Sequence, residues 1–193
     1  ANLGREKARQ FIVTLAQEGR DWFASAAAFH REDENLVDWT YASGSPSARQ
    51  ANPVYMEVNG LELLLRKQWQ RLDISLGYTY LDKKSDYGTA TVDGSFYALN
   101  YARDRATVSV SYQLNETYAL RLDSEYRNQL ANPLRASDNN ALLSAASLDW
   151  TSPQFDEITA QLRIDNLTDD DYQSFPGTPA VGRQISLNVR YNF

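Results

Sequence analysis

The chain has 193 residues and a formal net charge of −6. Nothing gathers its 19 Lys and Arg residues into one basic face, which argues against a nucleic-acid partner. Cysteine is absent, and this excludes disulfide frameworks and thiol chemistry. No run of about 18 consecutive apolar residues occurs, so the sequence also excludes a transmembrane helix.

Apolar and polar residues are closely interleaved along the chain. Hydrophobic residues make up 42% of the sequence and aromatic residues 12%, yet the mean hydropathy is −0.55. A β-strand with one apolar and one polar face produces this dilution. Such a strand needs only about 9 to 11 residues to cross a membrane, so a barrel in a membrane stays open as a class.

Alternation with a period of two predicts about nine strands. It is clearest where Val108 and Val110 interleave with Thr107, Ser109 and Ser111. No segment shows a sustained helical period, so the predicted fold class is all-β, an antiparallel barrel segment. In chain order, the expected strands lie around residues 11–15, 22–30, 61–65, 72–80, 106–114, 118–125, 142–150, 158–165 and 185–193.

The connections between these strands alternate in length. Short connections are expected at residues 18–21, 68–71, 114–117 and 152–156. Long polar connections are expected at residues 31–53, 83–95, 127–139 and 168–182. Outer-membrane barrels sort their loops in this way, with short turns in the periplasm and long loops outside, whereas a β-sandwich has no reason to do so. The last strand follows a long loop and should therefore end in the periplasm.

Two further patterns agree with a barrel. Charged residues on the polar faces, such as Arg121, Asp123, Arg163 and Asp165, should line a wet or plugged lumen, because Arg or Lys at the bilayer midplane costs roughly 2 to 4 kcal/mol. Aromatic rings near strand ends can lie at the level of the lipid headgroups. The residues expected in this belt are Trp69, Tyr78, Tyr80, Tyr112, Tyr118, Tyr126, Trp150, Tyr191 and Phe193.

The end of the chain carries a paired motif. Residues 163–172 read Arg-Ile-Asp-Asn-Leu-Thr-Asp-Asp-Asp-Tyr, and Val181-Gly182-Arg183 precede the final strand. This order resembles the close of TonB-dependent outer-membrane receptors, in which Asn-Leu-Phe-Asp-x-x-Tyr comes before Gly-Arg and a strand ending in Tyr-x-Phe. Two positions depart from that pattern, since Thr168 replaces Phe and Val181 replaces Pro.

The beginning of the chain is similar to the same family. Residues 2–11 resemble the Asn-Leu-x-Pro-Glu-Lys-Ser stretch that begins a strand well inside those barrels, and residues 59–62 resemble its x-Gly-Val-Glu strand. The resemblance implies a barrel of about 22 strands, occluded by an N-terminal plug, that imports scarce chelates such as siderophores or cobalamin. We therefore expect residues 1–193 to be the C-terminal portion of the barrel, cut from a longer protein, with the plug domain absent.

The resemblance also implies a place in the cell and a set of partners. The expected location is the bacterial outer membrane. The expected partners are outer-membrane lipid, the barrel-assembly machinery, a chelate ligand, and an inner-membrane energy-transducing complex reached through the plug. One alternative is a small self-contained barrel that acts as a passive pore or as a structural or adhesive protein, and another is a soluble β-sandwich binding module. A closed ring of even strand number would exclude part of a larger barrel.

No catalytic residue, metal site or cofactor is predicted, and we expect a protein that is not an enzyme. His30 is the only histidine, and no Gly-x-Ser-x-Gly motif accompanies it, so it is interpreted as a residue at a strand end near the outer interface. The acids at 169–171 do not have the spacing of a calcium loop and are interpreted as a solvated turn. The charged run at 31–34 is interpreted as the start of a solvated loop.

Candidate ligand-binding residues come from the long connections. Exposed aromatic rings and charges there could capture a ligand by stacking and charge-assisted contacts, although packing within the loops or contact with headgroups would explain each residue equally well. The candidates are Trp39, Tyr41, Arg49, Tyr87, Phe96, Tyr97, Tyr172 and Phe175.

The final strand suggests a separate role in assembly. Its alternating apolar residues are Ile185, Leu187, Val189, Tyr191 and Phe193. A terminal aromatic residue after such an alternation resembles the signal that the barrel-assembly machinery reads in outer-membrane barrels, by strand pairing at an exposed edge. Anchoring of Phe193 at the periplasmic interface is a compatible interpretation.

Overall fold

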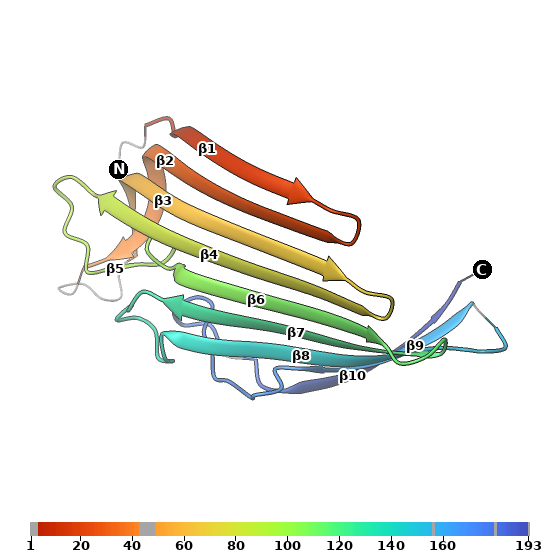
Figure 1. Ribbon diagram of the computed structural model, residues 1–193. Helices are drawn as coiled ribbons and strands as arrows, with labels where there is room; N and C mark the ends of the chain where they lie inside the picture. The colour runs from red at the N-terminus through yellow and green to blue at the C-terminus, as the bar shows by residue number, and fades with distance from the viewer. Residues whose placement is uncertain (1–3, 43–48, 156, 180, 193) are drawn as a thin grey trace.

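The computed structural model describes residues 4–42, 49–155, 157–179 and 181–192, and these form one curved antiparallel sheet (Figure 1). Within those residues no helix is long and apolar enough to cross a membrane. The strands are β1 (Lys7–Glu18), β2 (Trp22–Tyr41), β3 (Gln50–Gln68), β4 (Leu72–Asp86), β5 (Gly94–Ser95), β6 (Ala102–Gln113), β7 (Tyr118–Gln129), β8 (Asn140–Thr151), β9 (Ile158–Asp165) and β10 (Gln184–Tyr191).

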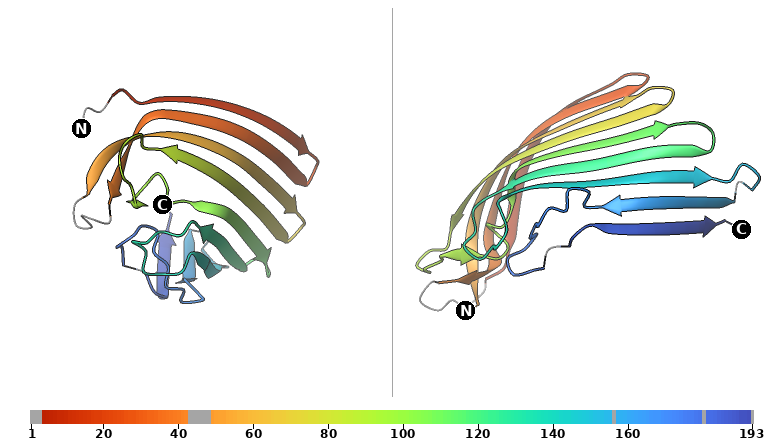
Figure 2. Two further views of the ribbon diagram at one scale, coloured as in Figure 1. Left: turned by 90° about the vertical axis from the view of Figure 1, so that its left-hand side faces the viewer. Right: turned by 90° about the horizontal axis from the view of Figure 1, so that it is seen from below.

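Strands that follow one another in the chain lie side by side, in the order β1-β2-β3-β4-β6-β7-β8-β9-β10. The two-residue strand β5 lies off this path and pairs with the end of β2. In the described part of the chain, β1 pairs only with β2 and β10 only with β9, so the sheet is an open trough (Figure 2). All nine strands expected from the alternation are confirmed, and β5 is the one that it missed.

The sorting of connections by length is also confirmed. Short turns join β1 to β2, β3 to β4, β6 to β7 and β8 to β9, and all lie at the end of the trough where the chain terminates (Figure 1). The longer connections lie at the opposite end, where the chain begins. We refer to these two ends as the turn end and the loop end.

The prediction of a long loop at residues 31–53 is wrong. Strand β2 continues to Tyr41 and β3 begins at Gln50, with the β2–β3 register unbroken to Thr40↔Gln50 except for an irregularity between Asp33 and Leu36. The charges that suggested a loop are satisfied on the strand itself, because Arg31 and Asp33 share a face and their side chains are paired at 2.7 Å. The connection expected at residue 83 likewise begins only after β4 ends at Asp86, because β4 stays paired with β3 as far as Tyr55↔Asp86.

The irregularity in β2 is a β-bulge. Asn35 has a φ of 57°. Two residues of β2 lie between Asp33 and Leu36, opposite a single residue of β3, and pairing resumes with Leu36 opposite Val54. A bulge bends its strand and increases the local twist. Beyond this point the β2–β3 hairpin curves over the concave side of the trough, and β5 takes up the edge of β2 that β1 leaves free (Figure 2).

The two faces of the sheet differ in chemistry. The outer face carries an apolar band that includes the exposed side chains of Leu76, Val108 and Leu122. Toward the loop end, Tyr78 and Tyr126 lie on either side of Ala106, and toward the turn end Tyr118 lies opposite Trp150, so aromatic rings border the band on both sides. This arrangement is typical of barrels in a membrane.

Among the described residues, a cluster of buried hydrophobic side chains lies at the loop end, on the concave side. Val54, Met56 and Val58 of β3 pack there against Ala98 of the β4–β6 connection. Phe29, Leu36, Leu81 and Tyr87 are partly buried around this cluster. The β4–β6 connection is therefore folded inward onto the wall of the trough instead of extending into solvent.

The two-faced sheet predicts opposite effects for the same substitution on its two sides. Val108→Arg should lower the free energy of unfolding from a lipid bilayer by about 2 to 4 kcal/mol, because a guanidinium would then lie among lipid chains. Ser111→Arg on the same strand should change it by less than about 1 kcal/mol, because Ser111 lines a hollow on the concave side. Reversible unfolding from lipid vesicles in denaturant measures both, and equal losses would contradict the assignment of faces.

Candidate functional site

The eight predicted ligand-binding residues all lie at the loop end, but not all are accessible. Trp39 and Tyr41 belong to strand β2 and not to a loop. Tyr41 and Tyr172 are buried, with 8% and 7% of their surfaces exposed, so the expectation that they are exposed is wrong. Tyr97 and Phe175 are the accessible pair, at 56% and 47% exposed.

Asp38, which the sequence did not single out, organises this end of the molecule. It lies on β2 beyond the bulge and is fully buried. One carboxylate oxygen accepts hydrogen bonds from the hydroxyls of Tyr87 (2.7 Å) and Ser95 (2.6 Å), and the other accepts from the backbone N–H groups of Tyr97 (3.2 Å) and Ala98 (3.3 Å). Four donors from one connection thus compensate for the desolvation of the charge.

Tyr87 remains a donor over a wide pH range. Burial, together with its hydrogen bond to the Asp38 carboxylate, raises the pKa of Tyr87 well above its usual value of 10.0. A raised pKa in the folded state means that this interaction is fully present below about pH 10 and is lost only as the pH rises through the folded pKa. The contact between Tyr87 and Asp38 therefore does not respond to pH near neutrality.

Three connections are tied together through the β4–β6 segment. The Asn132 side chain donates a hydrogen bond to the backbone carbonyl of Ser95 at 2.8 Å, which links the β7–β8 connection to the β4–β6 segment. The Asn100 side chain donates to the carbonyl of Ser174 at 2.9 Å, which links the β9–β10 connection. Beside this second link, the rings of Tyr97 and Phe175 lie with centroids 6.0 Å apart and planes tilted by 59°. The structure thus brings two predicted ligand residues into one exposed aromatic pair.

Two further aromatic candidates, Phe96 and Tyr172, are held by cationic side chains. The guanidinium of Arg49 lies 4.1 Å from the centroid of the Phe96 ring. Arg127 donates to the Tyr172 hydroxyl at 3.0 Å and also pairs with Glu125. Cation–π contacts and hydrogen bonds of this kind fix the rings in place. These contacts therefore stabilise the loop end. Among the aromatic candidates, Tyr97, Phe175 and Trp39, which is 45% exposed, are the accessible rings.

Along the concave wall, the charges differ between the two halves of the trough. Toward the loop end they are paired: Arg105 bonds Glu125 at 2.8 Å, and Arg163 bonds Asp165 at 2.8 Å. Mid-wall, Asp123 accepts a hydrogen bond from Ser109 at 2.6 Å. These contacts satisfy the charges of β6, β7 and β9 on the inner wall, whereas Lys83 on β4 forms no ion pair within the described residues.

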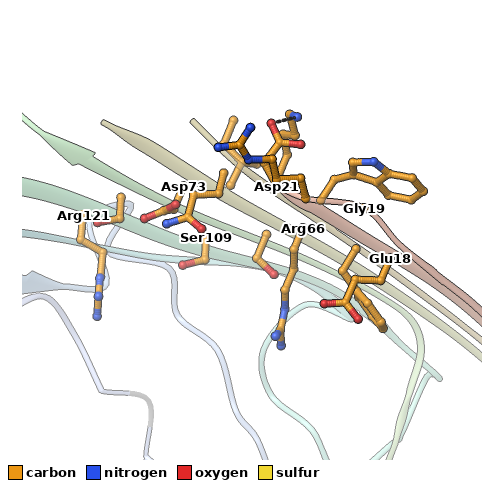
Figure 3. A pocket seen from close by; sticks show the side chains of 15 residues that line it. Glu18, Gly19, Asp21, Arg66, Asp73, Ser109 and Arg121 are labelled. Atoms are coloured by element: carbon orange, nitrogen blue, oxygen red, sulfur yellow. Dashed lines mark hydrogen bonds and ion pairs between the residues drawn. The ribbon is translucent and has the colours of Figure 1, made fainter. Parts of the chain in front are cut away.

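At the turn end, four charged side chains surround an open hollow of ≈ 500 Å³ (Figure 3). They are Glu18, Arg66, Asp73 and Arg121, and all four are exposed. Within the described ranges, none of the four forms an ion pair or hydrogen bond with another side chain. Three further charged residues line the hollow: Arg20 in the β1–β2 turn, and Asp21 and Lys67, whose side chains are joined at 2.5 Å. The charged surface around this hollow is therefore open to a polar partner.

Other residues considered from the sequence have structural partners. His30 lies within β2 and not at its end, and its Nδ1 lies 2.9 Å from Asn59 Oδ1. The solvated turn expected at 169–171 is partly wrong, because Asp169 accepts from the Arg183 N–H at 2.7 Å and Asp170 accepts from the Leu142 N–H at 2.9 Å. No group of three or more His, Cys, Asp or Glu residues that could hold a metal ion occurs in the part of the chain that the structure describes.

The final strand is fully exposed along its length. Ile185, Leu187 and Val189 are each 69% exposed and Tyr191 is 58% exposed, and β10 pairs with β9 alone in the described part of the chain. Its outer face and its free edge are therefore both accessible. Phe193, the last of the predicted assembly residues, lies outside the described residues.

Three solved structures share this fold across nearly the whole chain. The FrpB iron transporter from Neisseria meningitidis (F3-3 variant) superposes with a TM-score of 0.73 at 17% identity, covering 100% of this chain and 32% of that chain. The copper transporter OprC gives 0.75 at 17% identity, with coverages of 100% and 32%. The pyoverdine outer membrane receptor FpvA from Pseudomonas aeruginosa PAO1 gives 0.70 at 13% identity, with coverages of 99% and 30%. This chain thus spans about a third of each.

The outer apolar band, the sorted connections and the polar concave wall define the class of protein as a segment of an antiparallel β-barrel wall. A family model described as "TonB dependent receptor-like, beta-barrel" matches residues 1–167. The chain belongs to this family of TonB-dependent receptor β-barrels, as its terminal motifs predicted. No curated protein sequence matches it.

The four hydrogen bonds to Asp38 predict that Asp38→Asn loosens the β4–β6 connection. An amide would place an N–H₂ group against donors, which should lower the free energy of local opening by about 2 kcal/mol. The amides of Tyr97 and Ala98 should then exchange with deuterium roughly 30-fold faster in mass spectrometry. Asp82→Asn, at an exposed position on β4, is the matched control and should leave these amides unchanged.

Proposed function

We propose that this chain forms the C-terminal wall of an outer-membrane receptor that takes up a scarce chelate, such as a siderophore–iron complex or cobalamin, by active transport. The observation that carries the proposal is the division of the trough into two ends. Tied loops with an exposed aromatic pair occupy one end, and unpaired wall charges surround a hollow at the other. A ligand would enter past the loops, and the polar interior of the barrel would hold the plug.

The open sheet supports a place in a larger barrel. Each edge strand presents unpaired backbone groups, which membrane barrels avoid by closing. The described sheet ends at β1 and β10 without closure, and the chain spans about a third of the structures it resembles. On this proposal, further strands continue from β1 and close the ring against β10, and the plug lies within it.

The hollow at the turn end suits the surface of such a plug. Glu18, Arg66, Asp73 and Arg121 offer two negative and two positive charges toward the interior. A plug with complementary polar groups at this level would pair them, and the plug in turn would contact the energy-transducing complex of the inner membrane. Catalysis has no part in this proposal.

Uptake in cells tests the proposal. The complete protein, expressed in a Gram-negative strain that lacks its own chelate receptors, should support accumulation of radioactive iron supplied as siderophore complexes, or of labelled cobalamin. Accumulation should stop when an uncoupler collapses the inner-membrane proton gradient or when the energy-transducing complex is deleted. Uptake that continues without energy would instead favour the passive pore, and no uptake of any chelate would contradict the receptor.

The exposed final strand supports a role in assembly. We propose that Ile185, Leu187, Val189, Tyr191 and Phe193 present the edge that the barrel-assembly machinery reads. Deletion of Phe193 in the complete protein should lower its level in isolated outer membranes at least several-fold, as judged by immunoblotting. Replacement of Asn192, which lies between the two aromatic residues, by Ser is the control and should leave the level unchanged. Normal assembly without Phe193 would remove its role as a signal.

A further inference from the structure

A second hollow lies on the concave wall beneath the β4–β6 connection. It has a volume of ≈ 520 Å³, within the range of roughly 300 to 1,000 Å³ usual for small-molecule sites. Its apolar floor consists of the partly buried Phe29, Leu36 and Leu81, which pack on the buried cluster of Met56 and Val58, and Tyr97 of the exposed aromatic pair forms part of its rim. An apolar floor on the inner wall of a barrel is unusual, because that face is ordinarily polar.

Gly60 gives this floor its shape. The tip of the Phe29 ring on β2 lies over Gly60 on β3, so close that a Cβ added at position 60 would come 2.2 Å from Phe29 Cζ. Any larger residue would have to displace the ring, and the open direction is the hollow. Glycine at this position therefore keeps Phe29 against the wall and the space above it free.

Lys83 supplies a cation to the same hollow. Its ammonium group lies 4.3 Å from the centroid of the Tyr101 ring, and within the described residues it has no carboxylate within ion-pair distance. Tyr101 is itself fixed, because it is buried and its hydroxyl accepts a hydrogen bond from the Lys83 backbone N–H at 3.2 Å. The ring positions the ammonium group without neutralising its charge.

The other charges around the hollow do not cancel Lys83. Asp33 is committed to Arg31, which bonds both of its carboxylate oxygens at 2.7 to 2.9 Å. Glu62 lies lower on the wall, opposite Thr79 in the register, whereas Lys83 lies opposite Val58. Four strand residues separate those levels, which is about 13 Å at 3.3 Å per residue. The upper part of the hollow thus combines an apolar floor, an aromatic rim and one uncompensated positive charge.

We infer that this hollow is the part of the receptor that binds the chelate, and that it selects an anionic ligand with a flat apolar or aromatic body. The apolar body would lie on Phe29, Leu36 and Leu81 beneath Tyr97, and the anionic group would meet Lys83. The inference rests on the proposed function, which it narrows from chelates in general to this chemical class.

Two iron complexes of opposite character serve as probes. Iron(III) with 2,3-dihydroxybenzoate is anionic and aromatic, and iron(III) with acetohydroxamate is uncharged and aliphatic. Equilibrium dialysis of the complete protein in detergent micelles, with radioactive iron, measures the dissociation constant for each. The first complex should bind at least tenfold more tightly than the second, and this preference should shrink as salt screens the charge.

Adjacent lysines on opposite faces of β4 give a matched pair of variants. Lys83→Met keeps the length of the side chain and removes the charge, and it should weaken binding of the anionic complex about tenfold, with little effect on the uncharged one. Lys84→Met makes the same change on the outer face and should leave both constants unchanged. Equal affinities in the two variants would overturn the inference.

Gly60→Ala tests the shape of the hollow independently of charge. The displaced Phe29 ring should weaken binding of the anionic complex. The double variant Gly60→Ala with Phe29→Leu should recover part of the lost affinity, because the smaller side chain reopens the hollow although the aromatic ring is gone. Recovery distinguishes a filled hollow from a misfolded barrel. No loss of binding in Gly60→Ala, or no binding of the anionic complex to the unaltered protein, would also overturn the inference. Energised uptake that persists in Lys83→Met cells, with binding unchanged, would leave the proposed function standing without this site.

Discussion

The whole structure depends on the two-residue repeat of the extended chain. Because successive side chains point to opposite faces, each strand can present apolar side chains to one environment and polar side chains to the other. On β4 these are Leu76 and Ser75, and on β6 they are Val108 and Ser109. The backbone groups are satisfied along the sheet by neighbouring strands, which frees each face to follow its own chemistry. A slip of one residue in register would exchange the faces, so the same alternation also fixes the register.

The charged run of β2 shows where the alternation was insufficient as a guide. The expected strands matched the structure within the apolar band, where only one face is polar. Outside that band both faces of a strand can be polar. The charged residues Arg31, Glu32 and Asp33 therefore suggested a loop, although their backbone pairing with β3 continues without interruption. The polarity of its side chains indicates which environment a strand lies in, whereas backbone pairing determines where the strand ends. Strands that project beyond a membrane are therefore underestimated from sequence.

The loop end could be predicted only in part for a related reason. Aromatic residues in long connections pointed to the correct region, but which rings are buried depends on contacts between segments far apart in the chain. Asp38 joins β2 to residues about 50 to 60 positions later, and nothing local to Leu36-Val37-Asp38-Trp39 reveals those donors. The bulge at Asn35 is what turns Asp38 toward them, and a bulge is set by pairing with β3.

The distribution of paired and unpaired charges follows from what each part of the wall must contact. Ion pairs such as Arg105 with Glu125 neutralise the wall locally, so they need no partner in the interior. Lys83 beneath the loops and Arg66 and Arg121 near the turns keep their charges available, at two separate levels of the trough. An isolated exposed charge contributes little to stability. Its value in such an interior lies in what it can bind, and the two levels therefore suit two different partners: a small anionic ligand near the loops and a larger polar surface near the turns.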